Sequence, residues 1–584
     1  MKRDGLFVQG TENTDVPVDG GQTGLFIATE AKVSDRAKVL CVGLEVLLSA
    51  ILFLAILGVY SLSWFQGVGA SVSTIGAERV LRGEIPYRDF WTMYAPGHFY
   101  LLALLFRIFG SHILVEAVAA SVVCAAAAVV CYRLVLNLAN KRVAAIACAG
   151  IFAAAIYNTE YFKSLGTYPP TILFVLAALN LMVLYYKSGK LSHLIGAGLA
   201  TGAAVVFKHD VGGYTAVAIL AGLLAHAFVT PLATPGGARP LSWRLTLYCI
   251  GVTVIALPIC VFFAVVAGKD LLQDLIIFPL TDFPFSRPEH YPGVFELSIY
   301  GKSFLKAVAE LFRYVTFMLP FALFLCGLVA AGVAVTRRQP VYVALGVTFA
   351  VAYLLHYVAA HVQINTHIIS MSVYGAFAGV LCVDLFEREL GFRRPALFKI
   401  LSVALAGSWL LSLVAEPADK AWAEWKRPTA ELKLEKVKGQ RVSPKLVGFL
   451  SELLPFIDAE LSPHDHVFVG LHRHDAVIVG ANAPLYFMLN RPIGTKYNEL
   501  HPAIVDTAEV QQEIIRGLQE KNVSLIILYH KFPDEMLERA KARFRKHLPR
   551  VGATNLDNFI RANYVRIREI GRYAIWKRKD AVAP

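Results

Sequence analysis

The residues that could do chemistry gather in one polar stretch between apolar runs, residues 77–110 (AERVLRGEIPYRDFWTMYAPGHFYLLALLFRIFG). Within it, Asp89 follows Arg88. The positive charge of an adjacent arginine lowers the pKa of a carboxyl group and keeps it ionised. An ionised carboxylate can act as a general base that takes the proton of an attacking hydroxyl. We therefore predict Asp89 as a catalytic base, with Arg88 and Tyr87 contacting the substrate.

Other roles remain open for the acids of this stretch. Glu78 and Glu84 are alternative bases. Glu78 lies four residues before Arg82, which is the spacing of an ion pair within a helix. Asp89 itself could instead cap a turn or form a salt bridge within a polar loop.

A second candidate group, Lys208 and His209, ends an apolar run and is followed by Asp210. A lysine and an imidazole at a membrane edge could bind the phosphate of a lipid. The alternative is an ordinary lysine that extends from a helix end into the headgroup region. Three further loop side chains are predicted to bind substrate: Glu160, Arg287 and His290.

The sequence shows no required cofactor and no defined metal site. A divalent cation at Glu160 is possible, because such ions bridge carboxylates and phosphates. The His-rich turns at 464–466 and 472–475 lack the ligand spacing of zinc sites, and we predict them to be solvated loops.

Composition identifies the elements that must position these residues. The 584 residues are 56% hydrophobic and only 17% charged, whereas soluble domains carry about 25% charged residues. This excludes a simple soluble enzyme, a disordered chain and a disulfide scaffold. A membrane-spanning helix needs about 20 apolar residues. We predict about 11 transmembrane helices, at 39–62, 112–138, 142–158, 168–187, 191–207, 211–230, 245–267, 314–336, 340–358, 366–386 and 396–414.

The distribution of lysine and arginine predicts the orientation. The apolar stretch 97–110 is short and contains Arg107, so we predict that it does not span. The basic loops then fall on one side, which the positive-inside rule makes cytoplasmic together with the N-terminus. Loops 63–111 and 268–313, and all residues after 414, face outward. These basic loops account for the net charge of +13, and no motif indicates a nucleic-acid partner.

The two ends of the chain differ from the apolar middle. Residues 1–38 are polar, and we predict a disordered cytoplasmic segment. Residues 415–584 combine an amphipathic stretch, 419–456, with strand-like and helical runs, which predicts an extracytoplasmic α/β domain. The predicted strands are 466–470, 476–480, 523–530, 564–570 and 572–578, the last two forming a hairpin at Gly571, and the predicted helices are 506–521 and 534–547. The fold class is thus a polytopic α-helical membrane protein with a C-terminal α/β domain.

Two stretches resemble a known family. The first loop, from Gly83 through Pro86-Tyr87-Arg88-Asp89-Phe90 to the segment 97–110, resembles polyprenol-phosphate-dependent glycosyltransferases of the GT-C superfamily, in particular those similar to dolichyl-phosphate-mannose-protein mannosyltransferases. The tail stretch 486–500 is similar to the extracytoplasmic domain of such enzymes. Many relatives carry an Asp-Glu pair after the first span, whereas residues 66–69 here contain no acid.

The resemblance implies an activity. Such enzymes transfer a sugar, with inversion, from a polyprenyl-phosphate donor to a lipid, glycan or protein acceptor on the outer face of the membrane, and an outer-loop carboxylate, here Asp89, acts as base. The membrane domain 39–414 would be GT-C-like, in a multi-pass protein of a bacterial inner membrane. The alternatives are a lipid or solute transporter or flippase, and a membrane transferase similar to an O-antigen polymerase or ligase.

Overall fold

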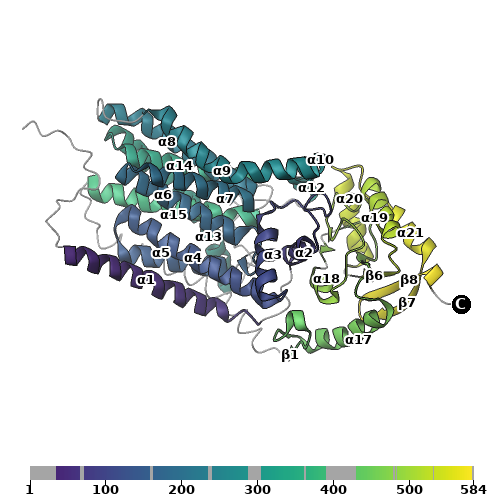
Figure 1. Cartoon of the computed structure of the whole chain (residues 1–584). Helices are drawn as coiled ribbons and strands as arrows, with labels where there is room; N and C mark the ends of the chain where they lie inside the picture. The colour runs from purple at the N-terminus through teal and green to yellow at the C-terminus, as the bar shows by residue number, and fades with distance from the viewer. Residues whose placement is uncertain are drawn as a thin grey trace, which may run out of the picture.

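The computed structural model describes residues 35–65, 71–157, 162–233, 240–286, 304–360, 364–389, 429–477, 480–481, 483–530 and 532–581. A helical bundle comprises the elements up to Glu389, and an α/β region comprises those from Ala430 onward. The first-loop helices α2 (Val72–Leu81) and α3 (Gly97–Phe109) lie where the two parts meet (Figure 1).

The bundle has the composition of a membrane domain. In the described part of the chain, 7 helices are long and apolar enough to cross a membrane. They lie within α1 (Asp35–Ser61), α4 (Ile113–Ala139), α6 (Tyr168–Ser188), α8 (His209–Ala233), α9 (Leu241–Ala267), α14 (Pro340–Ala360) and α15 (Ile364–Glu389). Shorter apolar segments lie in α3, α5 (Arg142–Tyr157), α7 (Leu191–Phe207) and α13 (Phe304–Thr336). The last predicted span, 396–414, lies outside the described residues.

Helix α3 is the apolar stretch that we predicted not to span. Its 13 residues are fewer than the roughly 20 that cross a bilayer core. Phe99, Leu102 and Phe106 are buried, whereas Leu104 and Ile108 are exposed on the other side of the helix. A short helix with one buried and one exposed apolar face suits the membrane interface.

Two element boundaries differ from the sequence predictions. Helix α1 begins at Asp35, inside the segment 1–38. The predicted outer loop 268–313 begins with short helices that continue α9, and α13 begins at Phe304. The short elements are α10 (Lys269–Leu272), the π-helical turn η2 (Gln273–Ile277), α11 (Phe278–Thr281) and α12 (Phe283–Ser286).

The α/β region is built on a four-stranded sheet in the order β3-β6-β8-β7. Strands β3 (Val467–Leu471) and β6 (Leu525–Tyr529) are parallel, and β8 (Tyr573–Arg578) runs antiparallel to both β6 and β7 (Tyr564–Ile570). The predicted hairpin at Gly571 is confirmed, and its φ of 58° is one that glycine adopts without strain. Helices α17 (Pro444–Glu460), α18 (Ala483–Leu489), α19 (Ala508–Glu520), α20 (Asp534–Arg545) and α21 (Asn555–Asn563) complete the region.

Two predictions for this region are wrong in part. Within the predicted amphipathic stretch 419–456, β1 (Ala430–Glu431) pairs with β2 (Arg441–Val442), with a 3-10 turn, η3 (Glu435–Val437), between them. In the described part of this stretch, residues 429–456, the α-helix starts at Pro444, because Ser443 caps it and proline fits a first helical turn. Of the predicted strand 476–480, the described residues 476–477 are not in a strand, whereas Gly480 is, in β4 (Gly480–Ala481), which pairs with β5 (Glu499–Leu500).

Candidate functional site

The predicted base lies in a tight turn of the first loop. The backbone N–H of Tyr87 donates to the carbonyl of Phe90 at 2.8 Å, and that of Asp89 donates to the carbonyl of Ile85 at 2.9 Å. Tyr87 is fully buried and has a φ of 67°, which is uncommon outside glycine. This conformation places the Tyr87 ring inside while the Arg88 side chain stays 46% exposed. The turn therefore presents Arg88 and Asp89 together at the surface.

Asp89 is held as an ionised carboxylate. Its Oδ1 accepts from Nε of Arg88 at 2.9 Å, and its Oδ2 accepts from Nη2 of Arg88 and the N–H of Ile85, both at 2.7 Å. Partial burial raises the pKa of Asp89, but the bonds from Arg88 and Ile85 and the positive charges nearby outweigh it and lower the pKa. The predicted effect of Arg88 on Asp89 is confirmed.

This turn faces apolar helix surfaces. The Tyr87 ring packs edge-on against Phe263 of α9 with ring centroids 5.5 Å apart. The Tyr100 ring of α3 also packs against Phe263, with centroids 6.1 Å apart. Burial raises the pKa of the Tyr100 hydroxyl. The nearby charge of Arg88 lowers this pKa and that of Asp89 raises it. On α9, Phe262 and Val265 beside this contact are 48% and 79% exposed. The acid and its arginine thus lie next to surfaces suited to lipid.

Arg79 fixes the loop to the C-terminal region, and sequence reasoning missed it. Its side chain is fully buried. It donates to Glu84 at 2.6 Å and to the carbonyl of Asp89 at 2.8 Å. It also donates to the carbonyl of Thr495 at 3.2 Å and to Asn498 at 3.0 Å. The sequence could not reveal the link to the C-terminal region, because Thr495 and Asn498 lie more than 400 residues away from Arg79.

The two alternative acids are engaged in ion pairs. Glu84 accepts from Arg79, as above, and Glu78 pairs with Arg82 at 3.7 Å and with Lys436 of the C-terminal region. The Glu78–Arg82 pair predicted from spacing is confirmed. Asp89 has the most exposed carboxylate side chain of the three, at 30% against 25% for Glu84 and 8% for Glu78.

Lys208 lies between α7 and α8 in a polar group of its own. Its Nζ donates to Asp210 at 2.8 Å and lies 5.1 Å from the ring centroid of Tyr168. Asp210 is 3.8 Å from Nε2 of His367, whose Nδ1 lies 3.0 Å from Nδ1 of His356. His209 adds a buried Nδ1 with no hydrogen-bond partner. The group therefore contains a buried lysine, Lys208, that forms an ion pair with Asp210.

The first loop approaches this lysine group through Gly97. A Cβ on Gly97 would lie 2.9 Å from the carbonyl oxygen of Val206 and 3.2 Å from the ring of Phe207. Glycine is required there because the start of α3 packs directly on the end of α7. The structure thus brings the Tyr87–Asp89 turn and the Lys208–His209 pair to the same end of the bundle. Glu160, Arg287 and His290 lie outside the described residues.

The short helices after α9 and the tail residues 496–501 also pack at this end of the bundle. Trp91 packs against Phe278 of α11 at 5.5 Å and against His501 at 5.9 Å. Lys496 donates to Asp270 of α10 at 2.7 Å, and its carbonyl accepts from the N–H of Trp91 at 3.0 Å. The first loop (63–111), the described start of the second loop (268–286) and the tail stretch 486–500 therefore pack against one another. We call this contact region the joint.

Comparison with known proteins agrees with this arrangement. Residues 94–264 match the family model of dolichyl-phosphate-mannose-protein mannosyltransferases. The matched region begins in the first loop, includes α3 and Lys208, and ends within α9. Over these residues the chain is similar to that family of membrane glycosyltransferases.

Two solved structures resemble this chain at low sequence identity. ArnT from Cupriavidus metallidurans bound to undecaprenyl phosphate has a TM-score of 0.50 and 12% identity, with 92% of this chain and 99% of that chain covered. The archaeal oligosaccharyltransferase AglB from Archaeoglobus fulgidus, in complex with an inhibitory peptide and a dolichol-phosphate, has a TM-score of 0.48 and 12% identity, with 92% and 75% covered. None of the curated proteins matches the chain significantly.

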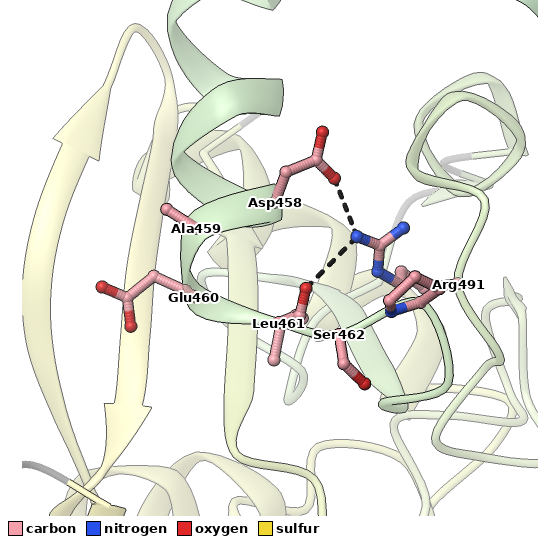
Figure 2. Close-up of a pocket in the computed structure, with 7 residues that line it drawn as sticks. Asp458, Ala459, Glu460, Leu461, Ser462 and Arg491 are labelled. Atoms are coloured by element: carbon pink, nitrogen blue, oxygen red, sulfur yellow. Dashed lines mark hydrogen bonds and ion pairs between the residues drawn. The ribbon is translucent and has the colours of Figure 1, made fainter.

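One hollow of the protein lies away from the predicted site residues. It has a volume of about 520 Å³ and is lined by residues 458–463 and Arg491 (Figure 2). Arg491 belongs to the tail stretch 486–500, and its Nη2 donates to Asp458 at 2.7 Å and to the carbonyl of Leu461 at 3.2 Å. Arg82 of the first loop donates to the carbonyl of Arg491 at 3.3 Å. Arg491 thus links the end of α17 to the tail stretch 486–500 and, through its carbonyl, to the first loop.

The prediction of solvated loops at the His-rich turns is wrong for 472–475. His474 is fully buried, and its Nδ1 lies 2.7 Å from Oδ1 of Asp557. Asp475 is also buried; burial raises its pKa, but hydrogen bonds from Arg473 and Lys541 lower it to about 2. Within the described ranges, no group of three or more His, Cys, Asp or Glu residues is placed to hold a metal ion.

Proposed function

We propose that the protein transfers a sugar from a polyprenyl-phosphate donor to a hydroxyl of a lipid, glycan or protein acceptor, with inversion at the anomeric carbon. The observation that carries the proposal is the ionised Arg88–Asp89 pair beside the exposed apolar surface of α9. A polyprenyl-phosphate donor needs such a place, because its chain lies in lipid and its phosphate in the headgroup region. The carrier class also agrees with the undecaprenyl phosphate in the ArnT structure.

In this proposal Asp89 is the general base. Its carboxylate takes the proton of the acceptor hydroxyl while the hydroxyl oxygen attacks the anomeric carbon. The bond from that carbon to the phosphate oxygen breaks, and the polyprenyl phosphate leaves with the electron pair. A positioned general base typically contributes about 10²- to 10⁴-fold in rate.

The remaining predicted site residues bind the donor and acceptor. Arg88 stabilises the departing phosphate through charge-assisted hydrogen bonds, and Tyr87 holds the turn that presents it. Lys208 supplies the second positive charge, with His209 beside it. Glu160, Arg287 and His290 are proposed to contact the substrates from the neighbouring outer loops.

The proposal includes an orientation. We place about 11 membrane spans in residues 39–414, with residues 1–38 in the cytoplasm and the domain 415–584 outside, in a bacterial inner membrane. Fusions at the C-terminus test this. Alkaline phosphatase should be active there and green fluorescent protein dark, and the reverse pattern would contradict an outward-facing site.

The activity is tested with purified protein in lipid nanodiscs and a panel of polyprenyl-phosphate sugars. We expect at least one donor to release polyprenyl phosphate in the wild type, with the sugar recovered on an acceptor in inverted configuration. A matched preparation of Asp89→Asn should show normal yield and almost no release. Consumption of a diphosphate-linked donor only, with no turnover of any monophosphate donor, would refute the proposed donor class.

A further inference from the structure

A buried arginine lies at the far end of the bundle from the proposed site. Arg244 is in the first turn of α9 and is 4% exposed. The other end of α9 leads into α10, which contacts the C-terminal region (Figure 1). At about 1.5 Å rise per residue, Arg244 lies roughly 35 Å from that end. The arginine is therefore independent of the transfer chemistry proposed above.

Arg244 has few partners for its charge. Its Nη1 lies 3.0 Å from Nδ1 of His226 on α8, and its Nε is buried without a hydrogen-bond partner. Within the described ranges, no carboxylate forms an ion pair with it. A guanidinium carries five N–H donors and a permanent charge. Burying that charge without a counter-ion costs several kcal/mol.

A buried acid at the same end of the bundle has partners other than Arg244. Asp384 of α15, at the same end of the bundle, accepts from Nε of Arg388 at 3.1 Å and from the hydroxyl of Tyr342 at 2.6 Å. The residues around Arg244 are neutral polar ones. His226 stacks on Tyr186 of α6 with centroids 5.1 Å apart, and the Tyr186 hydroxyl is buried without a partner. Two donors, from Arg244 and Tyr186, are therefore left unused in one region.

The surroundings place this group at the level of lipid headgroups. Trp243, next to Arg244, is 50% exposed, and Phe228 of α8 is 83% exposed. Tryptophan is enriched where a helix passes from the hydrocarbon core to the headgroups. Basic pockets between helices at this level bind phosphate-bearing lipid headgroups.

We propose that Arg244 and Tyr186 form a binding site for a phosphate group, with His226 as the positioning residue that orients the guanidinium. Arg244 supplies the charge and its free Nε–H, and Tyr186 donates its hydroxyl. The phosphate comes from an anionic lipid headgroup or from free phosphate. The site binds a ligand other than the sugar donor's phosphate, at the opposite membrane surface from Asp89.

The test is a binding titration of the purified full-length protein, read as thermal stabilisation. The probes are short-chain phosphatidylglycerol, short-chain phosphatidylcholine and inorganic phosphate. The variants are Arg244→Gln, Tyr186→Phe and the control Arg337→Gln, which changes an exposed arginine at the same end of the bundle. A lost charged hydrogen bond should weaken phosphatidylglycerol binding by about ten- to hundredfold in Arg244→Gln, and a lost neutral one by about two- to tenfold in Tyr186→Phe.

The probes separate the two sources of phosphate. Stabilisation by phosphatidylglycerol alone, lost in Arg244→Gln, assigns the site to an anionic headgroup. Equal dependence on Arg244 with inorganic phosphate assigns it to the free anion. Equal loss in Arg337→Gln, or no loss in Arg244→Gln, would overturn the proposal. If Arg244→Gln does not fold, unchanged binding in Tyr186→Phe overturns it, and weakened binding supports it.

Discussion

Replacing Asp89 by asparagine separates the chemistry of the carboxylate from its structural role. An asparagine oxygen can still accept the hydrogen bond from the N–H of Ile85, now 2.7 Å from Oδ2, so the turn is retained. The ion pair with Arg88 is lost. Because the Arg88 and Asp89 side chains are 46% and 30% exposed, that loss costs about 1 kcal/mol or less. The unfolding midpoint should therefore change little.

The rate should change far more. Without a base, sugar transfer should fall by about 10²- to 10⁴-fold, or about 3–5 kcal/mol in barrier height. The measurement is release of polyprenyl phosphate per minute at saturating donor, beside the unfolding midpoint of the same sample. Arg88→Gln is the matched control, since it breaks the same ion pair but leaves the carboxylate.

The pH profile adds an independent check of this reasoning. The pKa of Asp89 is lowered, so the wild-type base stays ionised from pH 5 to 8 and should impose no acid limb in that range. If Asp89→Asn retains more than a tenth of the wild-type rate while Arg88→Gln loses more, the carboxylate is not the base and the pair acts only through phosphate binding.

Three further predictions concern the residues around the site. Arg79→Met removes a fully buried guanidinium, so thermal unfolding should show a loss of about 3–5 kcal/mol; an effect no larger than that of Arg82→Met, at a half-buried position, would contradict the anchoring role. Lys208→Met should raise the KM for the donor at least tenfold, whereas Lys208→Arg should keep the KM close to the wild-type value. An unchanged KM in Lys208→Met would show that this lysine serves only to pair with Asp210. Burial raises the pKa of Asp274, in the η2 turn after α9, from 3.8 to about 7. The folded state therefore binds this proton more tightly than the unfolded state, and the stability of the protein should fall as the pH rises from about 4 to about 7. Asp274→Asn should make the unfolding midpoint less dependent on pH between pH 5 and 8, and an unchanged pH dependence would contradict this role of Asp274.

Features set by local sequence were predicted well. Helix α7 has the predicted bounds, 191–207, because the polar residues at both ends of an apolar run mark where the helix begins and ends. The hairpin at Gly571 was predicted because strand residues flank a residue tolerant of positive φ. The effect of Arg88 on Asp89 needed no knowledge of the fold, since the two residues are adjacent.

The sequence failed where a partner lies far along the chain. It gave no sign that His474 is buried against Asp557, or that the stretch after 429 starts as a hairpin. The run of alternating charged and apolar residues there fits a helix as well as a strand. Contacts with the chain after α1 favour the hairpin: the N–H of Arg441 donates to the carbonyl of Phe65 at 2.8 Å, and the Gln440 side chain donates to that of Trp64 at 2.8 Å. Propensity is weak compared with such tertiary contacts.

The sequence by itself therefore determined that this is a multi-helix membrane protein, which acid sits beside an arginine, and which family it resembles. Only the tertiary structure decided that Arg79 joins the first loop to the stretch 486–500 and that Gly97 brings this loop onto the end of α7. It also decided that Arg244 is buried with no ion-pair partner among the carboxylates of the described residues. The physical reason is that hydrophobicity and turn chemistry are local properties of the chain. Burial and the pairing of charges depend on what the rest of the chain brings to the same place.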